Sequence, residues 1–316
     1  MPNIVRGGSG WGQSLVDQTV LDQVKFEEFY PKIHVYKNLL PSADRLVEIL
    51  KESGQDRAAS YYFNMWDKWH VFGETIGGIT FNPIYEDLVD EEKKAAEEVI
   101  VRELENAFAV ATQHYMQYNG VTKGDDWTTM GPSICKYDSE MEHCGIDYLS
   151  MKYHTDYDYI RGDEPGDKFA ITCTMYLNDD YEGGEMWFNL SGSAADSFGE
   201  IPLQASEINI YKPSAGDVLV FPSGHPDVLS EESTYFHGVS RTWKSEDNPS
   251  NKYFIRSYYL IPFEGTSEWL AGQEKYGEEI WEKMETERIK ARVKTHEELQ
   301  LIKTRTAASD KECGLY

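Results

Sequence analysis

The sequence predicts an α+β protein, with an antiparallel β-sandwich or barrel in its middle and helices before and after it. Between about Pro132 and Pro262, short apolar segments alternate with clusters of Gly, Asp, Pro and Ser, and no helical pattern separates them. Strands that follow one another without crossover helices pair antiparallel and form a sandwich or barrel. Helical periodicity occurs only outside this region.

The composition is that of a folded, acidic protein. The 316-residue chain is 40% hydrophobic and 13% aromatic, which allows a large core and excludes global disorder. Its net charge of −25 disfavours partners that carry phosphate, so we expect neither nucleic-acid binding nor attachment to an anionic membrane. No apolar run could span a membrane or serve as a signal peptide, and the four cysteines show no CxxC spacing. Reduced thiols and a cytoplasmic location are therefore expected.

Several elements are predicted before the central region. The pattern indicates an N-terminal arm over 1–30, a short strand at 33–36 and a helix from about 42 to 53. A longer helix is predicted from 90 to 117, because acidic residues fill its first turn and apolar residues recur at helical spacing. Residues 55–80 are rich in aromatic side chains but show no regular period. They are expected to form an irregular loop, either a satellite core or a lid.

The central strands and the C-terminal region complete the predicted layout. Strands are expected at 133–137, 169–177, 184–189, 216–221 and 252–260. From 267 to about 305 the pattern is helical, and its apolar stripe changes register after Met284. That change favours a helix packed on its own domain, although a dimer interface fits the same residues. We expect a monomer or homodimer organised as an arm (1–30), a main domain (31–263, with its core at about 130–263) and a C-terminal helical extension (264–316).

The motif His154-Thr-Asp156 is the strongest chemical signal. Residues two apart in a strand project to the same face, so both side chains could bind one metal ion. A site with two histidines and one carboxylate then needs a further histidine from elsewhere in the fold. The candidates downstream are His225, His237 and His296. Of these, His237 adjoins an apparent central strand, whereas His225 reads as a loop residue and His296 lies in a charged helix.

A second signal is a pair of cations on one strand. Lys252, Phe254 and Arg256 share one face of the predicted strand. A buried cation on such a face needs a counter-charge, and the carboxylate of a ligand would provide one.

Together these motifs resemble the Fe(II)- and 2-oxoglutarate-dependent dioxygenases, and within them the prolyl 4-hydroxylase-like branch with its viral and bacterial members. The resemblance covers about 130–262, and more loosely 30–262. It implies a double-stranded β-helix, or jelly-roll, core with flanking N-terminal helices and a C-terminal helical extension. The residues that carry it are His154-Thr-Asp156, Thr172 to Asn178, Gly183-Gly-Glu185, Gly216 to Pro222, His237-Gly-Val239 and Lys252 to Ile255.

The resemblance also implies roles for individual residues. His154, Asp156 and His237 would be the iron ligands. Lys252 would pair with the distal carboxylate of 2-oxoglutarate, with Arg256 as the alternative because the interval after His237 is longer than usual. Three further residues would line the co-substrate pocket, namely Tyr137, Thr172 and Tyr176.

The implied activity is that of a procollagen-proline dioxygenase-like enzyme. It would use Fe(II), 2-oxoglutarate and O2, with ascorbate as a candidate reductant, and would hydroxylate proline in a protein or peptide substrate. The same chemistry on a lysyl residue or a small molecule is the first alternative. A cupin-like jelly roll that binds a metal or ligand without catalysis is the second.

Overall fold

The computed structural model describes residues 4–5, 12, 14–52, 59–62, 66–69, 91–137, 149–156, 168–189, 208–224, 228, 235–240, 242–288 and 290. For some residues within these ranges, including His154, only the backbone is described. The chain divides into two compact units, one made of Met1–Tyr157 and Phe169–Leu260 and the other of Asp158–Lys168 and Ile261–Tyr316.

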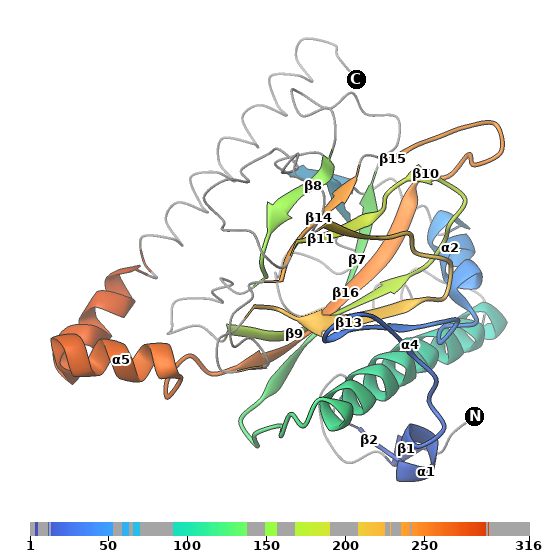
Figure 1. The fold of residues 1–316 in the computed structure, drawn as a ribbon. Coiled ribbons are helices and arrows are strands. Elements are labelled where there is room, and N and C mark those ends of the chain that lie inside the picture. The colour runs from blue at the N-terminus through green and yellow to red at the C-terminus, as the bar shows by residue number, and fades with distance from the viewer. Residues whose placement is uncertain are drawn as a thin grey trace, which may run out of the picture. The chain divides into compact units, whose positions relative to one another are not determined.

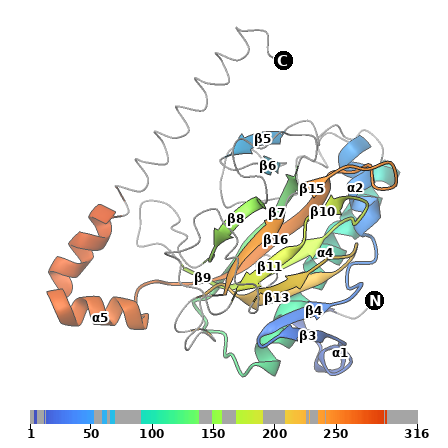
Figure 2. The same ribbon diagram turned by 45° about the horizontal axis from the view of Figure 1, so that its top comes forward.

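The largest sheet, here called the major sheet, has eight strands in the order β3-β4-β13-β9-β16-β7-β6-β5 (Figures 1 and 2). The pairs β4–β13, β13–β9 and β16–β7 are antiparallel. The strand bounds are β3 Glu27–Tyr30, β4 Ile33–Tyr36, β5 Ala59–Tyr62, β6 Trp66–Trp69, β7 Thr128–Tyr137, β9 Lys168–Tyr176, β13 Val218–Pro222 and β16 Lys252–Ile261.

A second sheet, the minor sheet, has four antiparallel strands in the order β12-β11-β14-β8. They are β8 Leu149–His154, β11 Met186–Asn189, β12 Ile208–Tyr211 and β14 Phe236–Ser240. Two short ribbons accompany the sheets, formed by β1 Ile4–Val5 with β2 Leu15–Val16 and by β10 Glu182–Gly183 with β15 Thr242–Trp243.

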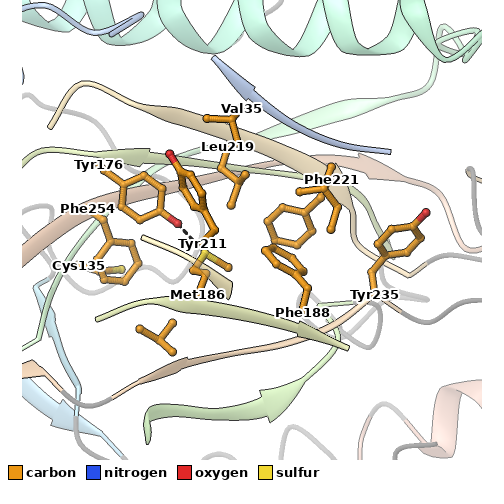
Figure 3. Close-up of a cluster of buried hydrophobic side chains, with 12 residues drawn as sticks. Val35, Cys135, Tyr176, Met186, Phe188, Tyr211, Leu219, Phe221, Tyr235 and Phe254 are labelled. Carbon is orange, nitrogen blue, oxygen red and sulfur yellow. Dashed lines mark hydrogen bonds between the residues drawn. The ribbon is translucent and has the colours of Figure 1, made fainter. Parts of the chain in front are cut away.

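The core lies between the two sheets. Leu219 and Phe221 of β13 pack with Met186 and Phe188 of β11, and all four side chains are buried (Figure 3). Alternation along each strand places every second side chain in this layer. The antiparallel pairing, the two facing sheets and the mixture of helix and strand agree with the predicted α+β class and jelly-roll core.

Helix α4, Glu91–Tyr118, covers the other face of the major sheet (Figures 1 and 2). The ring of its Phe108 stacks on Tyr259 of β16, and its His114 Nδ1 hydrogen bonds to the hydroxyl of Tyr36 at 2.9 Å. The helix also binds the N-terminal segment, since the Gln113 side chain accepts from the Val16 backbone and donates to that of Ser14. Two other helices of the first unit are α1 Gln18–Leu21 and α2 Ala43–Glu52.

In the second unit, α5 spans Ser267–Tyr276 and is capped by Thr266, whose hydroxyl accepts from the Trp269 backbone. The chain is helical again over 278–288. The expectation of one continuous helix is therefore wrong at Gly277, whose φ of 82° ends α5, because glycine adopts this conformation without a Cβ clash. Positions from 291 onward lie outside the described residues.

In the minor sheet the sequence pattern gives bounds only for β11. It expects a strand at His154-Thr-Asp156 and another adjoining His237 without giving their bounds, and it does not predict β12. The expectation that 55–80 is irregular is also wrong in part. β5 and β6 pair as a hairpin, and β6 joins β7 through Asp67 opposite Lys136. Tyr and Trp are strong strand formers, which accounts for this outcome. The rest of the segment, Phe63 and Phe72 included, lies outside the described residues, so the choice between lid and satellite core stays a prediction.

No helix among the described residues is long and apolar enough to cross a membrane.

His34 on β4 is fully buried where the major sheet meets α4. It stacks on Phe26 and meets the rings of Tyr115 and Tyr118, and neither of its ring nitrogens has a hydrogen-bond partner among the described residues. Burial lowers the pKa of His34 from 6.5 to about 4, with Glu28 opposing the shift and His114 adding to it. The folded protein therefore holds this ring neutral.

We expect a His34→Phe variant to lose less stability on acidification than the wild type. A histidine with a depressed folded-state pKa destabilises the native state as pH falls from 6.5 towards 4, and the loss near pH 5 is about 2 kcal/mol. Phe keeps a planar ring against Phe26 but cannot be protonated. Urea unfolding of both proteins near pH 8 and near pH 5 measures the difference, with the higher pH as the packing control. An equal loss in both proteins would contradict this account of His34.

Candidate active site

A cavity opens between the two sheets of the first unit. The empty space in it, with the open mouth included, is about 340 Å³. Six of the eight site residues predicted from the sequence line it: Asp156, Thr172, Tyr176, His237, Lys252 and Arg256. The other lining residues are Thr174, Met186, Val239, Phe254 and Tyr258.

Asp156 and His237 meet at one part of this cavity. Pairing of β8 with β14 places His154 directly opposite His237, and Asp156 follows two residues later. Asp156 Oδ2 lies 3.6 Å from His237 Nε2, and the two side chains are only 8% and 3% exposed. The expected strand geometry of His154-Thr-Asp156 is wrong in one respect, because β8 ends at His154 and Asp156 lies in the bend beyond it.

The ring of His237 is held in one orientation. Its Nδ1 lies 3.1 Å from the carbonyl oxygen of Tyr235, and Phe188 and Phe221 pack against the ring. Donation from Nδ1–H to that carbonyl leaves Nε2 to face Asp156. Tyr235 has a φ of 36°, an unusual conformation for a residue with a side chain, and it aims its carbonyl at the histidine.

The pair formed by Asp156 and His237 fits a divalent cation. A neutral imidazole nitrogen and a carboxylate oxygen are both lone-pair donors, so they repel one another at 3.6 Å unless a proton or a cation lies between them. Metal bonds of about 2.1 Å to each atom are compatible with this separation. Mixed nitrogen and oxygen donors of this type suit Fe(II) with positions left open. His154 is placed here only by its register opposite His237.

Two buried hydroxyl groups continue from Asp156 into the major sheet. Thr172 Oγ1 donates to Asp156 Oδ2 at 2.9 Å, and Ser223 Oγ lies 2.7 Å from Thr172 Oγ1. Thr172 belongs to β9 and lies opposite Phe221, while Ser223 directly follows β13. The register of this strand pair therefore brings the two hydroxyls together.

Lys252 lies at another part of the cavity. It is 1% exposed, and its Nζ donates to the carbonyl oxygen of Gly184 at 2.6 Å. The rings of Tyr176, Tyr181 and Phe254 surround the ammonium group at 5.1 to 5.6 Å. Burial, and secondarily the charge of Lys212, lowers the pKa of Lys252 to about 7, while Glu185 opposes the shift. An anion bound here would favour the charged form.

The remaining predicted residues fall around these two groups. Arg256 lines the cavity on the same strand as Lys252 and Phe254, so the shared face expected from the sequence is present. The hydroxyl of Tyr176 is directed to the sulfur of Met186. Tyr137 is placed by register only, as the partner of Lys252 in the β7–β16 pair.

Some residues in or beside the cavity were not found by sequence reasoning. Ser223 reaches the site only through Thr172, and Thr174 and Met186 lie among apolar strand residues that give no chemical signal. The one usable indication was alternation, since Thr172, Thr174 and Tyr176 are spaced two apart on β9 and share a face.

Residues 146–260 match the family model of the 2OG-Fe(II) oxygenase superfamily. This segment is therefore similar to that superfamily. It contains the positions of His154, Asp156, His237 and Lys252, and the resemblance predicted from their motifs is confirmed. The family implies Fe(II), 2-oxoglutarate and O2 as the metal and co-substrates.

Several solved structures are similar to this chain at low identity. The viral collagen prolyl hydroxylase of Paramecium Bursaria Chlorella virus-1, in its 2OG complex, is 13% identical over 73% of this chain and 96% of its own, with a TM-score of 0.40. The Phytophthora capsici prolyl 4-hydroxylase structure is 14% identical over 94% and 88%, with a TM-score of 0.41. A Burkholderia pseudomallei oxidoreductase of the 2OG-Fe(II) oxygenase family is 11% identical over 77% and 75%, with a TM-score of 0.31. Scores this low indicate no substrate, and no curated protein matches the sequence.

Gly184→Ala is expected to disturb the site around Lys252. A Cβ at this position would lie 2.6 Å from Tyr181, 2.9 Å from Thr242 and 3.2 Å from the Lys252 side chain, on a backbone with a φ of 70°. Gly120 is a matched control, because its φ is 67° and a Cβ there would meet nothing within 4 Å. Backbone strain should cost both variants about 1 to 2 kcal/mol, and overpacking should cost Gly184→Ala roughly 1 to 3 kcal/mol more. Equal unfolding free energies in urea would show that the site tolerates the methyl group.

Proposed function

We propose that the protein is an Fe(II)- and 2-oxoglutarate-dependent hydroxylase whose substrate is a proline residue in a peptide or protein. The observation that carries this proposal is one cavity holding a metal-compatible pair, Asp156 and His237, together with a buried cation, Lys252. A site that binds only a metal needs no buried cation. A site that also binds a dicarboxylate needs one to pair with a carboxylate group.

The spacing of the two groups suits such a co-substrate. Thr172, which contacts Asp156, and Tyr176, which adjoins Lys252, lie four residues apart on β9, or roughly 13 Å along the strand. The long side chain of Lys252 shortens the gap that a five-carbon dicarboxylate must bridge. Bound through one carboxylate to Lys252, the co-substrate would direct its other end to the metal-binding pair.

In this proposal the chain's own residues bind and orient. Asp156 and His237, with His154 as the predicted third ligand, would hold Fe(II). Bound Fe(II) would couple the oxidative decarboxylation of 2-oxoglutarate to the insertion of one oxygen atom into a C–H bond. Lys252 would hold the distal carboxylate, and the apolar lining of Met186, Val239 and Phe254 would exclude water.

The substrate part of the proposal rests on the motif resemblance to the prolyl 4-hydroxylase-like branch. A lysyl residue or a small molecule would use the same metal and co-substrate. The net charge of −25 argues against nucleic acid as the substrate. A panel of peptides that differ only in having proline or lysine at one position distinguishes prolyl from lysyl hydroxylation.

The wild type is expected to add about 16 daltons, one oxygen atom, to proline peptides when Fe(II), 2-oxoglutarate and O2 are present. Asp156→Ala should form no detectable product or succinate, because it removes a metal ligand. His237→Ala should weaken metal binding by more than roughly tenfold, whereas His225→Ala should leave it nearly unchanged. Mass spectrometry of the peptides and a succinate assay provide the readouts. Succinate formation by Asp156→Ala at the wild-type rate would remove Asp156 from the ligand set, and metal binding without any succinate would favour a non-catalytic jelly roll.

Lys252→Ala is expected to raise the KM for 2-oxoglutarate more than Arg256→Ala does. Lys252 is fully buried among three aromatic rings, so its loss would leave the distal carboxylate desolvated without a charged partner. A lost charge-assisted hydrogen bond corresponds to roughly a 10- to 100-fold increase. Steady-state titration of the co-substrate compares the two variants. A larger effect of Arg256→Ala would assign the distal carboxylate to Arg256.

A further inference from the structure

We propose that Thr172 and Ser223 form a positioning relay that fixes the carboxylate of Asp156 for metal binding. This inference rests on the proposed function, because it assigns to two further residues a role in holding the metal ligand. Neither hydroxyl is proposed as a metal ligand, so both would affect the metal through Asp156.

The hydrogen-bond directions along the relay follow from the donors available. Thr172 Oγ1 carries one proton, which it donates to Asp156 Oδ2 at 2.9 Å. The 2.7 Å contact between Thr172 Oγ1 and Ser223 Oγ must then use the proton of Ser223. The chain therefore runs from Ser223 to Thr172 to Asp156, with every proton pointing towards the negative charge. Hydrogen bonds that end on an ionised group are among the stronger ones in proteins.

Asp156 needs such support because its backbone lies outside the sheet. β8 ends at His154, and Asp156 lies in the bend that follows the strand. The two hydroxyls are anchored far better. Thr172 lies in the middle of β9 and is 2% exposed, and Ser223 is 1% exposed with its backbone N–H bonded to the carbonyl of Ala170. The relay thus ties a ligand on a bend to two central strands of the major sheet.

The relay acts on the carboxylate oxygen that lies nearest to His237. Oδ2 is the atom that faces His237 Nε2 at 3.6 Å, and it is also the atom that accepts from Thr172. Rotation of the carboxylate would break the Thr172 hydrogen bond, so the relay opposes it.

The chain offers a matched control for this role. Thr174 lies two residues further along β9, lines the same cavity and is 5% exposed, so it shares the face and burial of Thr172. Its substitution by Val changes the same atoms on the same strand without removing the hydrogen bond that Thr172 donates to Asp156.

The test is the affinity of the metal-free protein for Co(II), measured without O2 by chelator competition and by the visible absorption of the bound ion. Binding that persists in Asp156→Ala is subtracted. Thr172→Val should weaken Co(II) binding by about tenfold or more, the range seen when the partners of metal ligands are removed. Thr172→Ser should restore it, and Thr174→Val should stay within about twofold of the wild type.

Ser223 provides a second, independent comparison. Ser223→Ala should weaken binding less than Thr172→Val, and the double variant should bind no more weakly than Thr172→Val alone, because Ser223 acts only through Thr172. Thermal unfolding of the metal-free variants checks the fold, and if Thr172→Val does not fold, Thr172→Ser and Ser223→Ala decide the question. Wild-type affinity in Thr172→Val, or equal loss in Thr174→Val, would overturn the relay. Equal Co(II) binding by the wild type and Asp156→Ala would instead overturn the metal site itself.

Discussion

The rest of the site depends on charges that are buried between two packed sheets. Asp156 and Lys252 lie in one cavity of the core layer, and each loses hydration when the sheets pack. Burial lowers the pKa of Lys252 to about 7, because the charged form is the one that loses hydration. Such charges persist when hydrogen bonds and ligands offset the lost water. Thr172 supplies part of this for Asp156, and the carbonyl of Gly184 supplies part for Lys252. In the proposed function, a bound metal and a bound dicarboxylate would stabilise these charges further.

The sequence predicts the major sheet better than the minor sheet. Strands β4, β9, β13 and β16 of the major sheet are buried along almost their whole length, and the sequence pattern identifies all four to within a few residues. For the minor sheet the pattern gives bounds only for β11. Its β14 includes Gly238, and Gly is depleted in strands. Local propensity is therefore weakest where the site is built.

Only those site residues that belong to a recognisable chemical motif could be predicted from the sequence. His154, Asp156, His237 and Lys252 are recognisable by type and motif, and their assignment as ligands stays a prediction. Ser223 belongs to none of these motifs. Its contact with Thr172 exists because Phe221 lies opposite Thr172 in the β9–β13 pair, which places the end of one strand beside the middle of the other. Cross-strand register is set by the whole sheet, so no reading of either segment alone would find this pair.

The two faces of these strands have different roles. One face packs against α4 and stabilises the fold, and the other lines the cavity. On β9, Thr172, Thr174 and Tyr176 face the cavity, while the alternating Cys173 and Met175 are fully buried on the side of α4. On β16, Tyr258 lines the cavity and Tyr259 stacks on Phe108 of the helix. Substitutions on the helix side should therefore lower stability without a direct effect on ligand binding. The apolar contacts with α4 hold the face of these strands that is opposite the polar residues of the cavity. The helix thus allows a buried sheet to carry a polar site.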